Sequence, residues 1–504
     1  MSDEQDEVIQ FLLNPAHHGG APVDHVETHG AHIFLAGDEA LKIKRAVSYD
    51  YMDFSTLDIR EKMLRRELEL NQPAAPEIYR DVIPVTRNED GLNLGGSGEP
   101  VEWVLRMWRF PQEAELSQVV ARCEMTDRLA EDLGQAVARY HAQSSRRDAD
   151  GARLIGEIIE ELETAFSGMG QQLGDARVAQ FSSRAWRAFD RVSPLLTDRS
   201  AAGRVRRCHG DLHLRNLVLI DGRPVPFDAL EFDETLGTCD ILYDLAFLVM
   251  DLQHQTLHRA ANIVLNAWLF EQGGAEDGSL AALPLFLAIR AGIRAMVDVQ
   301  TDAAAHREGQ SNKDAQSYMD YAGRALDDAP PRLIAVGGLS GTGKTTLARC
   351  LAPEIGRFPG AVHLRSDLER KALAGVDPLE HLPEDAYSAA SAQDVYDRLQ
   401  ERAETILAAG QSVILDATFM APAERETVAS LAQRAGVDFT GIWLEAPEKT
   451  LTNRVTNRRE DASDADASVV AKQSKRDVGD IAWTRLDTNG ELNDLVTRAF
   501  DIVR

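Results

Sequence analysis

The run Gly338–Thr345 combines a pliable backbone with side chains that bind phosphate and magnesium. It reads Gly-Leu-Ser-Gly-Thr-Gly-Lys-Thr, which is a complete P-loop. Its glycines let backbone amides turn toward the β- and γ-phosphates of a nucleotide, Lys344 reaches the same oxygens, and the Thr345 hydroxyl can ligate Mg²⁺. We therefore predict a site for ATP or GTP with Mg²⁺, formed by Gly338, Ser340, Gly341, Thr342, Gly343, Lys344, Thr345 and Thr346.

Acidic and basic residues after the next apolar runs extend this site. Asp367 follows the run 362–365 and would lie across from the γ-phosphate, where it can take a proton from a bound hydroxyl. Arg370, three positions later, would hold an anionic acceptor. Asp416 ends the run 413–416 and suits a carboxylate that acts through Mg²⁺-bound water.

An arginine-rich segment, 454–459, follows further along the chain and reads Arg-Val-Thr-Asn-Arg-Arg. It is typical of a lid whose arginines stabilise the charge of a transferring phosphate. We predict Arg454 at the nucleotide and Arg458 at the acceptor. A solvated basic helix face is the alternative for each of these arginines.

A second cluster of residues suited to phosphoryl transfer lies in the segment 208–228. It reads Cys-His-Gly-Asp-Leu-His-Leu-Arg-Asn over 208–216, and Phe-Asp follows at 227–228. Phosphoryl transfer needs a carboxylate for the proton of the attacking hydroxyl, and oxygen or amide ligands for Mg²⁺. In kinase-like folds the base precedes a metal-binding Asn by five positions, as Asp211 precedes Asn216 here, and Asp228 suits a second metal ligand.

The cation that steadies the phosphates at this second cluster has few candidates. Residues 1–312 contain only three lysines, and Lys42 and Lys44 lie two apart on one predicted strand, so both point to the same face. We favour Lys42 for the phosphates and keep Lys44 as its competitor. Glu67, on the following helix, is the candidate partner of the lysine, with Glu61 as the alternative.

Residues 25–325 resemble the aminoglycoside phosphotransferase and choline kinase superfamily, most closely over 209–216. That superfamily has His-Gly-Asp where protein kinases have His-Arg-Asp. The resemblance implies a two-lobed protein-kinase-like fold in which Asp211 is the catalytic base, while Asn216 and Asp228 bind Mg²⁺.

Residues 332–504 resemble the P-loop kinases of small molecules and polynucleotides, a group that includes polynucleotide 5′-kinase, gluconate kinase and the zeta toxins. The sequence carries no recognisable arginine finger or sensor motif of a motor ATPase. The two parts together resemble bacterial fusion proteins described as bifunctional aminoglycoside phosphotransferase/ATP-binding proteins.

Apolar periodicity predicts the elements that hold these residues. In the first part we expect strands at 32–36, 40–44 and 101–110, a helix at 55–71 capped by Ser55, and mainly helices over 113–325. After 332 we expect strands at 333–336, 362–365, 413–416 and 439–444, alternating with helices, and a mobile loop or helix start at the acidic segment 461–468. This alternation predicts a parallel, doubly wound sheet.

The short linker Asp327–Pro331 is polar and stiffened by proline, which marks the domain boundary. We expect an α+β protein-kinase-like bilobal domain over 1–328, with an N-lobe to about 110 and a C-lobe over 111–328. An α/β P-loop domain with a parallel doubly wound sheet should follow over 332–504. Such a short linker also predicts contact between the two domains.

The composition excludes some partners. The 504 residues include 54 Lys and Arg against 81 Asp and Glu, a formal net charge of −27, which argues against binding nucleic acid or an anionic membrane through the global field. The four cysteines show no metal-type spacing and fit reduced thiols. Because the N-terminus is too acidic for a signal peptide, we expect a cytoplasmic protein.

Three functions fit these patterns. The first is a bifunctional kinase, each half of which phosphorylates a hydroxyl of a small molecule such as a sugar, an amino sugar or a similar metabolite. The second is one kinase regulated by a nucleotide-binding half. The third is a P-loop polynucleotide 5′-hydroxyl kinase, which the charge and the aromatic content of 6% disfavour. A homodimer is left open.

Overall fold

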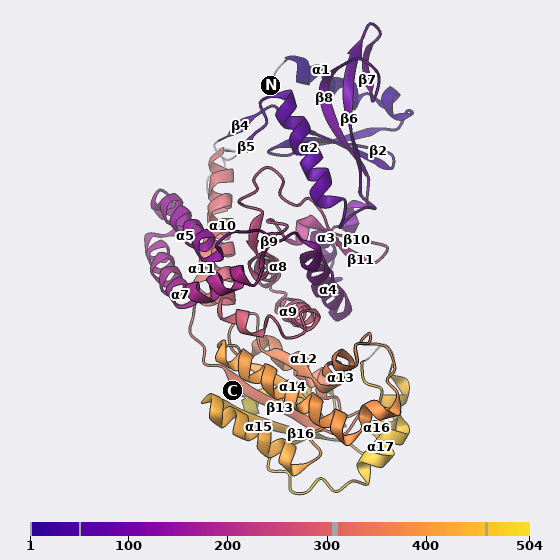
Figure 1. Ribbon diagram of the computed structural model, residues 1–504, viewed down its shortest axis with the longest axis vertical. Coiled ribbons are helices and arrows are strands. Elements are labelled where there is room, and N and C mark those ends of the chain that lie inside the picture. The colour runs from indigo at the N-terminus through magenta and orange to yellow at the C-terminus, as the bar shows by residue number, and fades with distance from the viewer. Residues whose placement is uncertain (1–2, 50–51, 305–310, 459–461, 504) are drawn as a thin grey trace. The chain divides into compact units, whose positions relative to one another are not determined.

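The computed structural model describes residues 3–49, 52–304, 311–458 and 462–503 (Figure 1). The chain forms two compact units. The first unit comprises residues 1–154 and 197–248, and the second comprises 155–196 and 249–504. Three helices run across these unit boundaries: α5 (Gly151–Ser167), α7 (Asp175–Ala201) and α8 (Ile241–His254).

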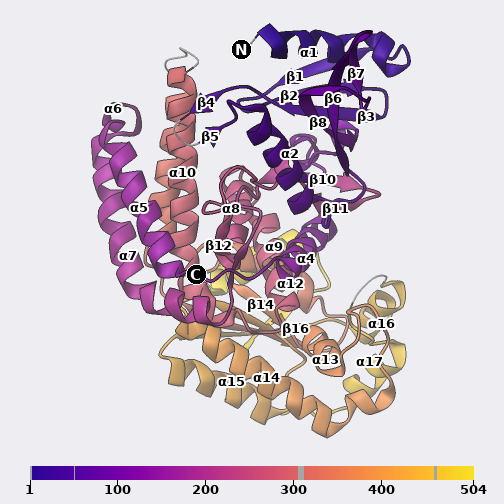
Figure 2. The same ribbon diagram turned by 45° about the horizontal axis from the view of Figure 1, so that its top comes forward.

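A six-stranded antiparallel sheet begins the first unit, in the order β1-β2-β3-β8-β6-β7. Its strands are β1 (Val23–Glu27), β2 (Ala31–Ala36), β3 (Glu39–Lys44), β6 (Tyr79–Asn88), β7 (Gly91–Leu94) and β8 (Glu99–Trp108). Two helices cover its opposite faces, α1 (Asp3–Leu13) and α2 (Leu57–Asn71) (Figure 2). Alternation along β3 explains this arrangement, because Ala40 packs with the cluster under α2 while Leu41 packs with that under α1.

The predicted strands at 32–36 and 40–44 are confirmed as β2 and β3, which pair antiparallel, and the turn between them places Gly37 at a φ of 56°. The predicted strand at 101–110 corresponds to β8 (Glu99–Trp108). The predicted cap of the following helix is wrong by one residue, since the Thr56 hydroxyl, not Ser55, accepts the Ile59 N–H at 3.3 Å. Helix α1 was not predicted.

Among its described residues, the remainder of the first unit holds helices and three pairs of short strands. The elements are β4 (Ser48–Tyr49), β5 (Met52–Asp53), α3 (Leu116–Ala121), α4 (Asp127–Gln143), β9 (Val205–Arg207), β10 (Leu217–Ile220), β11 (Arg223–Pro226) and β12 (Thr238–Asp240). β10 pairs with β11, and β9 pairs with β12. The His-Gly-Asp loop therefore connects β9 to β10.

Helices open the second unit and a five-stranded sheet completes it. The helices before the sheet are α6 (Gly170–Leu173), α9 (His258–Glu271), α10 (Leu283–Ala304) and α11 (Ser311–Ala325). The largely helical character predicted for 113–325 is thereby confirmed. Among the described residues, none of the helices has the length and apolar character needed to cross a membrane.

The sheet of the second unit is parallel throughout, in the order β14-β15-β13-β16-β17. Its strands are β13 (Arg332–Gly338), β14 (Val362–Arg365), β15 (Val413–Asp416), β16 (Asp438–Glu445) and β17 (Thr484–Asp487). The accompanying helices are α12 (Lys344–Leu351), α13 (Ser366–Ala374), α14 (Ala389–Ala408), α15 (Pro422–Ala435), α16 (Glu448–Asn457), α17 (Ala467–Ser474) and α18 (Leu492–Val503). The fold class predicted from the alternating pattern is confirmed.

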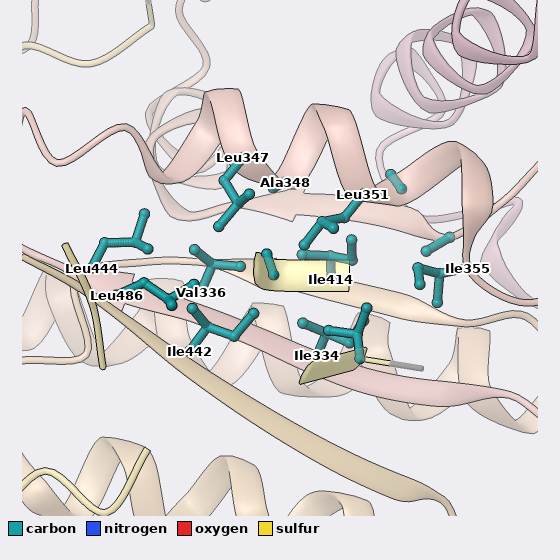
Figure 3. Packing of buried hydrophobic residues seen from close by; sticks show 14 of the residues in the cluster. Ile334, Val336, Leu347, Ala348, Leu351, Ile355, Ile414, Ile442, Leu444 and Leu486 are labelled. Carbon is teal, nitrogen blue, oxygen red and sulfur yellow. The ribbon is translucent and has the colours of Figure 1, made fainter. Parts of the chain in front are cut away.

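Apolar side chains from helix and sheet form the core of this domain. Leu347 and Leu351 of α12 pack onto Val336 and Ile334 of β13 and onto Ile414 of β15, all buried (Figure 3). All four residues of β15 are buried, as expected for a parallel strand covered on both faces. The core thus fixes the ends of β13 and β15, where the P-loop and Asp416 lie.

Candidate active sites

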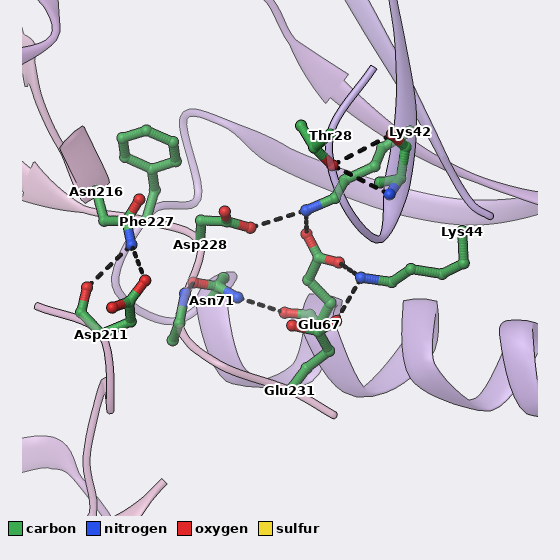
Figure 4. Close-up of polar contacts among 12 residues, drawn as sticks. Thr28, Lys42, Lys44, Glu67, Asn71, Asp211, Asn216, Phe227, Asp228 and Glu231 are labelled. Carbon is green, nitrogen blue, oxygen red and sulfur yellow. Dashed lines mark hydrogen bonds and ion pairs between the residues drawn. The ribbon is translucent and has the colours of Figure 1, made fainter. Parts of the chain in front are cut away.

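Lys42 is the centre of the candidate site in the first unit. Its Nζ atom donates to Glu67 Oε1 at 2.7 Å and to Asp228 Oδ1 at 2.8 Å (Figure 4). Burial alone would lower the pKa of Lys42, but the carboxylates of Asp228 and Glu67 raise it well above its ordinary value. Strand β3, helix α2 and the segment after β11 therefore bring one ammonium against two carboxylates.

Lys44 points to the same face as Lys42, as predicted, and shares Glu67 with it, but its second partner is Glu231 instead of Asp228. Its Nζ atom donates to Glu67 Oε2 at 2.6 Å and to Glu231 Oε1 at 2.5 Å. Glu67 is fully buried and bridges the two lysines. The alternative partner Glu61 instead pairs with Arg65 on the same helix, at 2.8 Å.

This geometry predicts different defects for the two lysines. Lys44→Met leaves the buried Glu231 without its cation and should lower the free energy of unfolding by about 3–5 kcal/mol. Lys42→Met leaves Asp228, whose side chain is 42% exposed, and should cost less stability, while phosphate transfer falls by about 10²–10³-fold. Urea unfolding and a transfer assay on both variants check this. The reverse pattern would contradict it.

The His-Gly-Asp loop brings its two predicted functional residues together. The amide nitrogen of Asn216 donates to the Asp211 backbone oxygen at 2.9 Å and to Asp211 Oδ2 at 3.0 Å. His213 Nε2 lies 3.3 Å from the same carboxylate oxygen. Asn216 thereby holds the carboxylate of Asp211 from within the loop.

Two residues that the sequence patterns did not single out hold Asp228. The Tyr79 hydroxyl accepts the Asp228 N–H at 2.9 Å, and Asn71 Oδ1 accepts the Ala229 N–H at 2.8 Å. Asp228 itself has a φ of 59°, in the left-handed region. Asn71 lies one helical turn after Glu67, a spacing that signals a shared face. No such signal marks Tyr79.

Asp244 braces the loop from behind. Its carboxylate accepts the backbone N–H groups of His209 at 3.2 Å and Gly210 at 2.9 Å, and lies 3.0 Å from His141 Nε2. Asp244 is fully buried. Asp244 therefore fixes the backbone of the loop at His209 and Gly210.

The P-loop of the second unit has a backbone that requires glycine. Gly338 has a φ of 137°, and a Cβ there would lie 2.5 Å from the Leu444 carbonyl oxygen. At Gly341, with a φ of 84°, a Cβ would lie 2.8 Å from the Leu451 carbonyl oxygen. The Ser340 N–H donates to Gln473 Oε1 of α17 at 2.8 Å, a contact that the sequence patterns did not predict.

Thr345 and Asp416 meet at the end of the sheet. The Thr345 hydroxyl donates to Asp416 Oδ2 at 2.6 Å, and Lys344 Nζ donates to the Leu339 carbonyl oxygen at 3.1 Å. Burial alone would raise the pKa of Asp416, but a hydrogen bond from His363 and nearby cations lower it to about 2. Of the other predicted P-loop residues, Thr342 is buried and Thr346 is exposed.

Asp367 lies in the first turn of α13, and its pKa is shifted in the opposite direction from that of Asp416. Burial raises its pKa, although the neighbouring Arg365 acts in the opposite direction. A carboxylate whose pKa is raised in this way is suited to accept a proton from a substrate hydroxyl. Arg365 is buried and was not among the predicted site residues.

Arg370 of α13 contacts the segment that joins α13 to α14. It donates to the Ala386 carbonyl oxygen at 3.0 Å, and its guanidinium lies 4.9 Å from the centre of the Tyr387 ring. Asp464, from the predicted acidic loop, accepts hydrogen bonds from Tyr387 at 2.6 Å and from Lys371 at 2.8 Å. Tyr387 thereby connects the segment before α17, which contains Asp464, to Arg370.

The two predicted lid arginines, Arg454 and Arg458, have different surroundings. Arg454 on α16 donates to the Thr488 carbonyl oxygen at 2.6 Å and to the Gly341 carbonyl oxygen at 3.4 Å, so it supports the P-loop backbone. Arg458 follows α16 and is partly buried. Arg459 and Asp461 lie outside the described residues. Within the acidic segment, the Asp466 side chain caps α17, which bears out the predicted helix start.

A buried ion-pair network supports α13 close to Asp367. Arg402 of α14 donates to both carboxylate oxygens of Asp277 at 2.8 Å and to Glu369 Oε1 at 2.5 Å. Asp277 and Glu369 are each 1% exposed. Asp277 belongs to the turn Asp277–Ala281 before α10, so the helical part of the second unit contributes to this network.

Removing one member of this network should be costly. We expect Asp277→Ala to lower the free energy of unfolding by about 3 kcal/mol, because Arg402 then stays buried with half of its counter-charge gone. The matched control is Asp394→Ala, an exposed position on the same α14, which should change stability by less than about 0.5 kcal/mol. Equal urea midpoints for the two variants would contradict the assigned role of the network.

Both parts of the chain match family models. Residues 60–282 match the model of the phosphotransferase enzyme family, and residues 333–476 match the model of an AAA domain, which is a P-loop domain. The chain therefore joins a phosphotransferase domain to a P-loop kinase domain, and the protein is a phosphotransferase of the kinase class.

Relatives of similar length exist. An uncharacterized protein of Mycobacterium tuberculosis strain H37Rv is 28% identical over 491 residues, covering 96% of this chain and 95% of the relative. Among solved structures, a choline/ethanolamine kinase family protein from Mesorhizobium loti is 14% identical, with a TM-score of 0.38, covering 64% of this chain and 95% of that protein. A gluconokinase from Sinorhizobium meliloti is 19% identical, with a TM-score of 0.25, covering 34% of this chain and 91% of that protein.

Proposed function

We propose that the protein is a bifunctional kinase in which each domain transfers the γ-phosphate of ATP or GTP to a hydroxyl of a small molecule. The observation that carries the proposal is the pairing of Lys42 with both Glu67 and Asp228 in one domain, alongside a complete P-loop in the other. Each domain has a cation for the phosphates and carboxylates for metal and proton, which are the groups that phosphoryl transfer requires.

In the first domain we assign the proton-accepting role to Asp211. Asn216 holds the Asp211 carboxylate, so that one of its oxygens is oriented by the loop itself. Lys42 would contact the nucleotide phosphates, and Glu67 keeps its ammonium in place from the buried side. This arrangement favours Lys42 over Lys44, because Lys42 contacts the partly exposed Asp228, whereas both partners of Lys44, Glu67 and Glu231, are buried.

In the second domain we assign the proton-accepting role to Asp367 and phosphate binding to Lys344. The raised pKa of Asp367, which follows from its burial, suits this task. Arg370 and Arg458 are proposed to bind the acceptor, and Arg454 to support the nucleotide loop from α16.

The residues present fit Mg²⁺ in both domains. The amide nitrogen of Asn216 donates to Asp211, so its amide oxygen would serve as a ligand together with the Asp228 carboxylate. In the second domain the Thr345 hydroxyl and the Asp416 carboxylate lie within 2.6 Å of each other. Oxygen donors of this kind are those that Mg²⁺ prefers, and the ion would neutralise phosphate charge when bound.

The proposal includes a cytoplasmic location, where ATP and the reduced thiols expected from the cysteine spacing are both found. The acceptors are proposed to be metabolites rather than nucleic acid, because the net charge of −27 opposes binding to a phosphate backbone.

A transfer assay tests the proposal. The full chain is incubated with γ-labelled ATP, Mg²⁺ and a pooled metabolite extract, and in parallel with 5′-hydroxyl oligonucleotides. We expect label in phosphate monoesters that alkaline phosphatase releases. Label found only in inorganic phosphate would contradict a kinase, and label found only in the oligonucleotides would favour the polynucleotide kinase alternative.

A further inference from the structure

The edge strand of the second-unit sheet is covered by a helix from outside the P-loop domain. β14 is the outermost strand, paired on one side only, with β15. The outward N–H and C=O groups of an edge strand need partners or invite pairing with another chain. Here the partners come from α9 (His258–Glu271), which lies within the part of the chain that matches the phosphotransferase family.

Two asparagine amides of α9 act as those partners. Asn262 Nδ2 donates to the Ala361 carbonyl oxygen at 3.0 Å and to the Pro359 carbonyl oxygen at 3.3 Å. Asn266 Oδ1 accepts the His363 N–H at 2.7 Å. Asn262 and Asn266 are one helical turn apart and so present their amides on one face, imitating the hydrogen bonds of a neighbouring strand.

His363 connects Asn266 of α9 to the residues next to the P-loop. Its Nε2 atom lies 3.3 Å from Asp416 Oδ2, the oxygen that accepts the Thr345 hydroxyl at 2.6 Å. Asp416, Thr345 and His363 are therefore linked through a single carboxylate oxygen. Because Asn266 fixes the backbone of His363, it sets the position from which the imidazole reaches Asp416.

We propose that Asn266 is a positioning residue for the magnesium site of the P-loop kinase, acting through His363 on Asp416. Helix α9 of the phosphotransferase domain thus completes the site of the other domain. The inference rests on the proposed function of the second domain, in which Asp416 serves Mg²⁺. Groups that orient a metal-site carboxylate from outside typically affect metal affinity by about 10–100-fold.

The test measures how much Mg²⁺ improves nucleotide binding by the P-loop. A fluorescent ATP analogue is titrated into the full chain, once with Mg²⁺ and once with EDTA. The same titration of a Lys344→Ala chain identifies the signal of the P-loop, because this substitution removes only that part of the binding. We expect Asn266→Ala to reduce the gain in affinity on adding Mg²⁺ by about 10-fold, with binding in EDTA unchanged.

Asn493→Ala is the matched control, since it makes the same chemical change at an exposed position of α18, in the same unit. The gain in nucleotide affinity that Mg²⁺ gives this variant should stay within about twofold of wild type, because the residue lies outside the contacts that link Asn266 to Asp416. His363→Ala should reproduce the defect of Asn266→Ala, and the double variant should be no worse than either one. Should Asn266→Ala not fold, His363→Ala carries the test alone.

Two results would overturn the inference. One is a magnesium gain that Asn266→Ala and His363→Ala leave intact. The other is an equal loss of binding in Mg²⁺ and in EDTA, which would make Asn266 merely structural. A wild-type chain whose Lys344-dependent binding shows no gain with Mg²⁺ would instead contradict the proposed function of the second domain, and the inference with it.

Discussion

Asp211→Asn should lower phosphate transfer by the first domain by about 10²–10⁴-fold, because general-base catalysis contributes a factor of that size. Asparagine has the same shape as aspartate and keeps an oxygen that can accept from Asn216, so the loop should stay in place. We therefore expect nucleotide binding and urea unfolding to remain as in wild type. The assay is best run in a Lys344→Ala chain, where only the first domain can transfer phosphate.

The control for this substitution is Asp221→Asn, which makes the same chemical change in the exposed turn between β10 and β11. Asn tolerates the left-handed conformation that Asp221 adopts, with its φ of 50°. Its transfer rate should equal that of wild type. An Asp211→Asn chain that retains full transfer would remove Asp211 from the catalytic role and leave the loop with a structural one.

Lys344→Ala should abolish useful nucleotide binding at the second domain. Hydrogen bonds to charged groups contribute about 1.5–3 kcal/mol each, and a loss of about 3 kcal/mol weakens binding roughly 150-fold. Lys344 donates to the Leu339 carbonyl oxygen of its own loop, and its charge favours the ionised forms of Asp367 and Asp416, so urea unfolding of the variant is measured beside nucleotide binding. Titration of a labelled nucleotide into the full chain measures the effect.

Lys449→Ala is the matched control, because Lys449 is an exposed lysine on α16 of the same domain. It removes the same charge from the surface and should leave affinity unchanged. If both alanine variants bind nucleotide equally well, the P-loop of this chain does not serve the nucleotide, and the assignment of Lys344 fails.

The sequence was sufficient for features that depend on contiguous residues. The P-loop needs its glycines, lysine and threonine next to one another, and the strands at 362–365 and 413–416 were predicted to the residue. The loop around Asp211 and Asn216 was predicted for the same reason, since a spacing of five positions is local.

The sequence was insufficient for contacts made across long separations. Glu231 meets Lys44 across 187 positions, and Asn71 meets the Ala229 N–H across 158. Asn266 reaches His363 across 97 positions. Such pairs depend on how elements pack, and a single acidic or amide residue among many carries no mark of its partner. Lys42 and Lys44 could not be separated for this reason, because their difference lies in which distant carboxylates they meet.

The central claim is that the chain holds two independent kinases. It is tested most directly by resolving the labelled products that wild type, Asp211→Asn, Lys344→Ala and the double variant form from γ-labelled ATP and a pooled metabolite extract. We predict two sets of products, one lost in each single variant and both lost in the double variant. If one single variant removes every product while the other changes only the rate, the chain is one kinase with a nucleotide-binding regulator, and the claim is contradicted.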